Sequence, residues 1–161
     1  MLRPLGEQEI ESVVRLIGSA MNSDEAEQAR KTLDFHVSCK QHALDDGRVY
    51  YVLAEGDAIQ GIVGLHQYVW GPAENVWLAW FAIDPNHRGM GLGKRLLDYI
   101  IDRATKLGYA KLYIETYSTP EFTAARAFYQ AKGFAQTGAV ESYLPNGGDM
   151  VVYCKELTTH V

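Results

Sequence analysis

The chain has 161 residues with 47% hydrophobic, 22% charged and 11% aromatic side chains, a globular composition that excludes disordered, collagen-like and disulfide-scaffold chains. Its 20 acidic and 15 basic residues give a formal charge of −5, which argues against nonspecific nucleic-acid binding, because such binding needs clustered Lys and Arg. Since the chain has neither a membrane-spanning hydrophobic run nor a signal-peptide core, we expect residues 1–161 to form one cytoplasmic domain that binds no membrane.

The first forty residues predict a short extended segment and two helices. After Met1–Leu5, hydrophobic residues recur at i, i+3, i+4 and i+7 from Ile10, which is typical of one face of an amphipathic helix. Asn22–Asp24 can cap a second, more polar helix that runs to about Val37. Its thin hydrophobic stripe predicts a surface position, as structural support or as a lid over a site.

The middle of the chain predicts three strands. Residues 49–55 and 59–69 are rich in β-forming residues and are separated by the turn Gly56-Asp57, so they predict a hairpin. Residues 76–83 are eight hydrophobic residues in succession. Such a run, bounded by turn residues, predicts a central strand that is buried on both faces.

The second half predicts the clearest helix and a mixed sheet. Residues 92–107 have one hydrophobic and one charged face, residues 110–116 alternate as in a strand, and a short helix covers about 122–132. Two strands follow at about 135–143 and 150–156. The central strand–helix–strand unit requires a parallel pair and the hairpins require antiparallel pairs, so we predict an α/β fold of the mixed-sheet (α+β) kind.

The connection between the buried strand and the clear helix, Asp84–Arg95, carries the most chemical information. Gly89, Gly91 and Gly93 alternate just before the helix, which lets a ligand approach the unpaired N–H groups of its first turn. These groups and the helix dipole favour an anion. The basic residues beside them are Arg88, Lys94 and Arg95.

Two common phosphate-binding motifs do not match this turn. The dinucleotide pattern Gly-x-Gly-x-x-Gly needs a glycine where Lys94 stands. A P-loop needs a glycine where Arg88 stands and Ser or Thr where Arg95 stands. The anion is therefore expected to belong to another kind of ligand.

Two segments together resemble the GNAT superfamily of N-acyltransferases. The segment Arg88-x-x-Gly91-x-Gly93, after a hydrophobic strand and Asp84-Pro85, is similar to the acetyl-CoA signature of that family. The downstream segment from Ala125 to Phe134 is similar to the family pattern Ala-Arg-x-Phe-Tyr-x-x-x-Gly-Phe. The predicted order of helices and strands also resembles that of the family over nearly the whole chain.

The resemblance implies a GNAT-like fold and acetyl-CoA as cosubstrate, without a metal. The strands at 77–83 and 110–116 would splay apart, with pantetheine in the gap and pyrophosphate on the amides of the glycine turn. The residues implicated in binding it are Phe81, Ala82, Ile83, Arg88, Gly89, Met90, Gly91, Leu92, Gly93 and Lys94. The acceptor would be an amine of a small molecule or peptide that attacks the thioester directly. The protein could form a homodimer.

The resemblance also assigns catalytic roles. Tyr129 matches the family tyrosine that protonates the leaving thiolate, and an ordinary tyrosine holds its proton at neutral pH. Phe122 stands where many relatives carry an asparagine that contacts the cofactor. For the general base, Glu115 at the end of its strand is the first candidate. His66 and Glu74 are the alternatives.

Three questions stay open at this level. Aromatic residues near the predicted cleft could form a wall for an apolar or cationic amine, although core packing is the simpler interpretation of Trp77 and Trp80. A longer acyl-CoA would also fit the motifs. Because no acidic residue lies on the buried strand, the alternative to an enzyme is a non-catalytic CoA-binding or sensory module.

Overall fold

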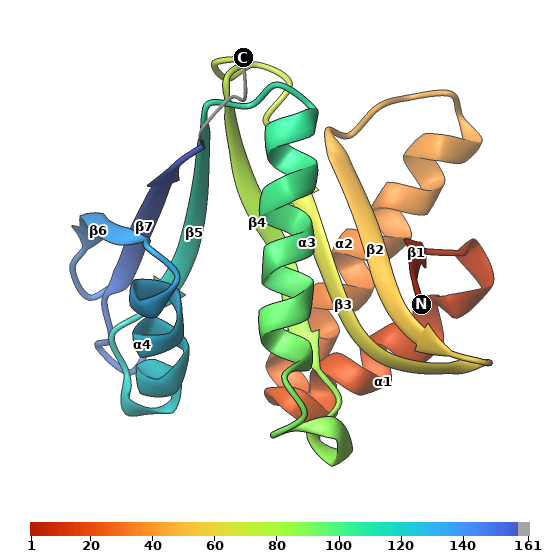
Figure 1. Ribbon diagram of the computed structural model, residues 1–161, viewed down its shortest axis with the longest axis horizontal. Helices are drawn as coiled ribbons and strands as arrows, with labels where there is room; N and C mark the ends of the chain where they lie inside the picture. Colours follow the sequence, from red (N-terminus) through yellow and green to blue (C-terminus); the bar gives the residue numbers. More distant parts are fainter. Residues whose placement is uncertain (158–161) are drawn as a thin grey trace.

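In the computed structural model, which describes residues 1–157, the chain forms a seven-stranded sheet in the order β1-β2-β3-β4-β5-β7-β6 with helices on both faces (Figure 1). The strands are β1 (Leu2–Pro4), β2 (Arg48–Glu55), β3 (Ala58–His66), β4 (Asn75–Ile83), β5 (Lys111–Tyr117), β6 (Ala135–Val140) and β7 (Met150–Glu156). The α-helices are α1 (Ile10–Ala20), α2 (Ser23–Gln41), α3 (Leu92–Lys106) and α4 (Thr123–Ala131), and the 3-10 turns are η1 (Glu7–Glu9), η2 (Pro85–His87) and η3 (Pro120–Phe122).

The predicted mixed α/β fold is confirmed, and the observed helices and strands differ from the predicted ones only in where some of them begin or end. The second helix continues to Gln41, because a buried side chain at Cys39 still faces the core. The hairpin strand stops at His66, since the next residue, Gln67, bonds through its N–H to the carbonyl of Gly47. Within residues 1–157, none of the helices has the length and hydrophobicity needed to span a bilayer.

The helices cover the sheet in two layers, with α1 and α2 on one face and α3 and α4 on the other (Figure 1). Alternate residues of each strand therefore enter different cores. In β2, Tyr51 and Leu53 pack with α3, whereas Tyr50 and Val52 pack with α1 and α2. This alternation decides which side chains of a strand can meet at one site.

The parallel pair at the centre of the sheet holds together only at one end. β4 pairs with β5 through three residues, Asn75–Trp77 against Lys111–Tyr113, and the strands then diverge. On its other side β4 bulges, because Ile62 of β3 pairs with Ala82 and Gly64 pairs with Ala79. The predicted separation of the two strands is thus present, and the bulge changes the direction of the β4 backbone between Ala79 and Ala82.

The prediction that β4 is buried on both faces is wrong. Only Val76 and Ala82 of this strand are fully buried, and the other residues are half-buried. The hydrophobic run suggested a strand with neighbours on both sides. Where β5 leaves β4, however, the residues of β4 line a cleft as well as packing against the two cores, and they stay partly exposed.

Candidate active site

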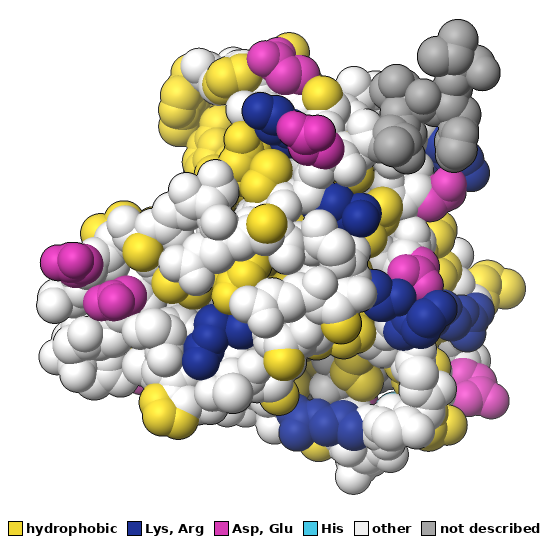
Figure 2. Space-filling model, turned by 60° about the vertical axis from the view of Figure 1, so that its left-hand side comes forward, with side chains coloured by type: hydrophobic (Ala, Val, Ile, Leu, Met, Phe, Trp, Pro, Cys, Tyr) yellow, Lys and Arg dark blue, Asp and Glu magenta, His cyan; other side chains and the backbone are white. Residues whose placement is uncertain are grey.

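A cleft of about 690 Å³ opens where β4 and β5 separate. Its walls come from α2, β2, β3, β4, β5 and α4, so it passes through the sheet from one helical layer to the other. Figure 2 shows hydrophobic side chains gathered in the upper part of this side of the molecule. The exposed hydrophobic residues on the β3–β4 connection, which Figure 1 places at the top, are Tyr68, Val69 and Trp70.

The glycine turn leads into the first turn of α3. Gly89 and Gly91 have φ values of +80° and +75°, a left-handed conformation that glycine adopts without strain. An added Cβ at either position would meet nothing within 4 Å, so the turn presents its backbone to open space. Within residues 1–157, none of the N–H groups from Gly89 to Lys94 donates a hydrogen bond to the protein, and the first helical bond begins at Arg95. Six successive unpaired donors beside a helix N-terminus have the geometry that suits an anion.

Two of the three basic side chains of the turn, Arg88 and Lys94, are already engaged. Arg88 donates to the carbonyl of Ala20 at 2.9 Å, which ties the turn to the end of α1. Lys94 reaches Asp98 at 3.1 Å, and Lys132 of α4 reaches the same carboxylate at 2.9 Å. These lysines hold the pKa of Asp98 below its usual value. The backbone N–H groups, rather than these side chains, are the free donors.

The structure separates the predicted cofactor-binding residues into two groups. Phe81, Ala82, Ile83 and Arg88 line the cleft. Gly89–Lys94 continue from Arg88 around the turn and do not line it. The two groups would suit different parts of one long ligand, an apolar arm in the cleft and an anionic group on the turn.

Tyr129 lies on the α3–α4 side of the cleft. Its side chain is 7% exposed and packs against Phe81, with ring centroids 6.3 Å apart, while Phe128 stacks on Phe81. Burial raises the pKa of Tyr129 well above its ordinary value, so the hydroxyl keeps its proton. Arg126 donates to the carbonyls of Tyr117 and Thr119 and thereby fixes α4 against the end of β5.

Glu115 lies on the other side of the sheet. It is exposed, it lines the cleft, and it accepts a hydrogen bond of 3.1 Å from the Tyr117 hydroxyl. Two more carboxylates, Glu25 of α2 and Glu121 of η3, line the same end. The pKa of Glu25 is raised by its partial burial and by repulsion from Asp24, Glu115 and Glu121. This end of the cleft therefore carries negative charge.

The two alternative bases are in poorer positions. His66 lines the cleft, but its pKa is lowered to about 4, mainly because burial disfavours the charged ring and also because Arg48 lies nearby. An imidazole with this pKa is a weak proton acceptor. Glu74 is exposed in the loop before β4 and does not line the cleft.

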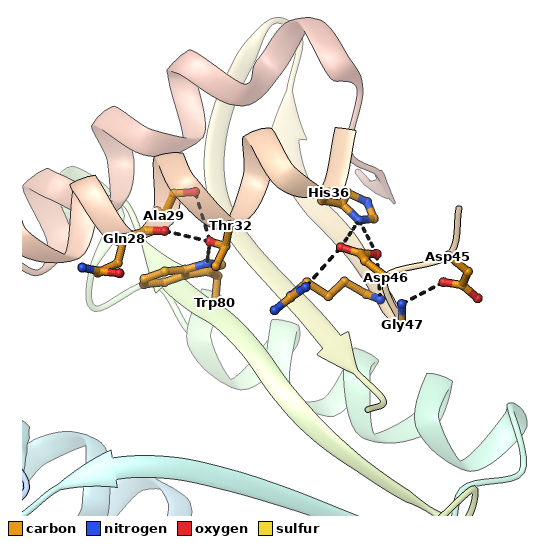
Figure 3. Close-up of polar contacts among 9 residues, drawn as sticks. Gln28, Ala29, Thr32, His36, Asp45, Asp46, Gly47 and Trp80 are labelled. Atoms are coloured by element: carbon orange, nitrogen blue, oxygen red, sulfur yellow. Dashed lines mark hydrogen bonds and ion pairs between the residues drawn. The ribbon is translucent and has the colours of Figure 1, made fainter. Parts of the chain in front are cut away.

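Several lining residues were not singled out from the sequence. They are Glu25, Thr32, Arg48, Tyr50 and Glu121. The polar helix α2 is a wall of the cleft: the Trp80 indole donates to the Thr32 hydroxyl at 2.8 Å (Figure 3). Trp77 and Trp80 are half-buried and line the cleft, and Trp80 also packs against the core beneath α1 and α2. The capping residues of α2 were the only sequence signal near Glu25.

A sheet that splays beside a glycine turn with free N–H groups is the arrangement that the resemblance to the GNAT family implied, and comparison with known proteins agrees. The sequence profile described as "Acetyltransferase (GNAT) family" matches residues 14–134, which is well over half of the chain. The chain belongs to the GNAT acetyltransferase family.

The matches to individual curated relatives cover a smaller part of the chain than the family profile does. The [ribosomal protein bS18]-alanine N-acetyltransferase of Escherichia coli K12 is 36% identical over 64 residues, which are 40% of this chain and 42% of that protein. N-acetyltransferase 8B of Rattus norvegicus is 30% identical over 109 residues, 66% of this chain and 47% of that protein. The chain thus spans less than half the length of these curated relatives.

Solved structures share the fold over almost the entire length. The structure of ribosomal-protein-S18-alanine N-acetyltransferase from Escherichia coli superposes with a TM-score of 0.76 at 20% identity, covering 100% of this chain and 96% of that chain. An aminoglycoside 6′-N-acetyltransferase complexed with coenzyme A gives 0.76 at 12% identity, covering 100% and 99%. At such identities the agreement establishes the fold.

Proposed function

We propose that this protein is an N-acetyltransferase that transfers an acetyl group from acetyl-CoA to a primary amine of a small molecule or peptide. The observation that carries the proposal is the row of free N–H groups from Gly89 to Lys94 at the end of a splayed cleft that Tyr129 also lines. The row suits a pyrophosphate, and the half-buried strand β4 suits a pantetheine arm. Acetyl-CoA supplies an activated acetyl thioester.

The roles of the side chains follow from the two faces of the sheet. Glu115 would accept the proton of the attacking amine on the α2 side, as the amide bond forms. Tyr129 would donate its proton to the departing sulfur on the α4 side, as the carbon–sulfur bond breaks. A backbone N–H of the β4 bulge would polarise the carbonyl. Acid and base thus act from opposite sides of one reacting carbon.

A thermal-shift titration tests the cofactor. At about 100 times the dissociation constant, acetyl-CoA should stabilise a one-site binder by roughly 2.7 kcal/mol. For a chain of this size we expect the midpoint of unfolding to rise by about 5–10 °C with acetyl-CoA or CoA and to stay unchanged with NAD. Absence of a shift with CoA would remove the basis of the proposal. A shift without thiol release on any amine would leave a CoA-binding module.

The assignment of the base is tested by Glu115→Gln, which keeps the size of the side chain and its bond to Tyr117 while removing the proton acceptor. We expect kcat to fall by about 10²-fold, with acetyl-CoA affinity unchanged. His66→Gln is the matched comparison, and we expect less than a few-fold loss of kcat because His66 is a weak acceptor. The opposite ranking of the two variants would transfer the role to His66.

A further inference from the structure

The cleft has an acceptor end whose floor is set by cross-strand register. Arg48 of β2 pairs with His66 of β3, and His66 pairs with Trp77 of β4. Trp77 in turn pairs with Tyr113 of β5, and the two rings stack with centroids 5.0 Å apart. A row of side chains therefore crosses four strands, and Arg48, His66 and Trp77 of this row line the cleft.

Two residue pairs further along, Tyr50 contributes a polar group that the described part of the chain leaves unpaired. Its ring lies on Gly64, where an added Cβ would come within 2.5 Å of Tyr50 Cδ1. The side chain is 3% exposed and lines the cleft, yet within residues 1–157 its hydroxyl has no hydrogen-bond partner. Burial of an unpaired hydroxyl is unfavourable, so a polar atom of a ligand is the natural partner.

Arg48 provides charge at the same place. Its Nη1 donates to Asp46 at 3.3 Å, and Asp46 is held by His36 Nδ1 at 2.9 Å (Figure 3). Among the described residues, Nε and Nη2 of Arg48 make no hydrogen bond, and this edge of a guanidinium can bind a carboxylate through two parallel bonds. His66 is uncharged at neutral pH, because its pKa is about 4.

The opposite end of the cleft has the opposite charge. Glu25, Glu115 and Glu121 line it, and they lie close enough together that the charges of Glu115 and Glu121 contribute to the raised pKa of Glu25. Within residues 1–157 no group of three His, Cys, Asp or Glu side chains is arranged to hold a metal ion. The three carboxylates favour a cationic group and Arg48 favours an anionic one, so the lining of the cleft carries both charges.

We infer that the acceptor is a small primary amine that also carries a carboxylate, with the carboxylate bound by Arg48 and the Tyr50 hydroxyl. This inference rests on the proposed acetyl transfer and specifies its substrate class. The amine then lies toward Glu115, and the aromatic rings contact the carbon skeleton. Arg48 and Tyr50 also border a second cavity of about 430 Å³, but His66 and the three glutamates border only the cleft.

The test compares amino acids with amines that differ only by the carboxylate: L-lysine with cadaverine, and L-phenylalanine with phenethylamine. For each, kcat/KM is measured with acetyl-CoA, and binding to the CoA-saturated protein is measured by calorimetry. We expect the wild type to prefer one or both amino acids by at least about 10-fold, since a hydrogen bond to a charged group contributes that much or more.

Tyr50→Phe isolates the hydroxyl. Because this group has no protein partner, we expect the variant to unfold at the same or a higher temperature, while its preference for the amino acid falls about 10-fold. Tyr51→Phe is the matched control. The Tyr51 hydroxyl accepts a bond of 3.1 Å from Arg103 on the other face, so its loss should lower stability and leave the preference unchanged.

The outcomes separate this inference from the proposed function. Equal use or equal binding of both members of each pair overturns the carboxylate assignment and leaves the acetyltransferase proposal intact. An unchanged preference in Tyr50→Phe also overturns it. Preferential binding of an amino acid without any acetyl transfer supports the carboxylate site and counts against the proposed reaction.

Discussion

Gly93→Glu should abolish acetyl-CoA binding in a protein that remains folded. Gly93 is the second residue of α3 and does not have a positive φ, and an added Cβ would meet Phe81 and Phe128 at 3.9 Å and Ile83 at 4.0 Å, which are ordinary contacts. A carboxylate in the first turn of a helix is favourable for the helix dipole, so stability should be kept. The same carboxylate would compete for the free N–H groups and repel a pyrophosphate. We expect acetyl-CoA affinity to fall by at least about 10²-fold, measured by calorimetry.

Two control variants separate charge from position. Gly93→Gln adds a side chain of the same length without charge, and we expect it to bind more tightly than Gly93→Glu. Gly138→Glu makes the same change of net charge on the exposed strand β6, where an added Cβ meets nothing within 4 Å, and should bind as the wild type. Wild-type affinity in Gly93→Glu would show that the turn is not the pyrophosphate site.

Tyr129→Phe should slow acetyl transfer by about 10²-fold or more, with acetyl-CoA affinity nearly unchanged, if Tyr129 is the general acid. The reason is that only the hydroxyl is removed, and the ring contacts with Phe81 and Phe134 remain. Single-turnover kinetics with a saturating amine measures the chemical step directly. Tyr153→Phe is the control, because Tyr153 is also buried but does not line the cleft.

The pH dependence of the wild type gives a second measure of the same role. Burial raises the pKa of Tyr129 above the ordinary value near 10, so the proton stays on the hydroxyl as the pH rises through 10. The rate of transfer should therefore rise as the amine deprotonates and should not fall near pH 10. If the rate falls near pH 10 in the wild type but not in Tyr129→Phe, the Tyr129 hydroxyl ionises with an ordinary pKa. If Tyr129→Phe keeps full activity, the role of Tyr129 is packing and not proton transfer.

The sequence predicted the parts of the site that lie close together in the chain. The glycine turn and the amphipathic helix after it are continuous in sequence, and the unpaired N–H groups follow from helix geometry alone. The order of strands and helices, with one parallel pair among antiparallel pairs, also follows from local patterns. A role for Tyr129 could be predicted from the sequence, because the motif that contains it resembles the family pattern.

The part of the cleft proposed to bind the acceptor, with its basic and acidic ends, could not be predicted in this way. Glu25, Tyr50 and Glu115 are separated by 25 and 65 positions along the chain, and no local pattern marks them as neighbours. Strand register brings Arg48 and His66 into one row, and helix packing places α2 over it. The sequence also could not show that β4 lines a cleft, because a hydrophobic run looks the same whether its neighbour stays paired or leaves.

The sequence by itself therefore indicated the family, through two motifs that resemble the family patterns, and it predicted the mixed sheet and a backbone site for an anion, since these last two depend on periodicity and on glycine at fixed spacing. Only the tertiary structure decided where β4 and β5 separate and which side chains meet there. The physical reason is that the chemistry of the acceptor end arises from contacts across strands and layers. Such contacts are fixed by pairing register and packing, and neither is encoded within one segment of the chain.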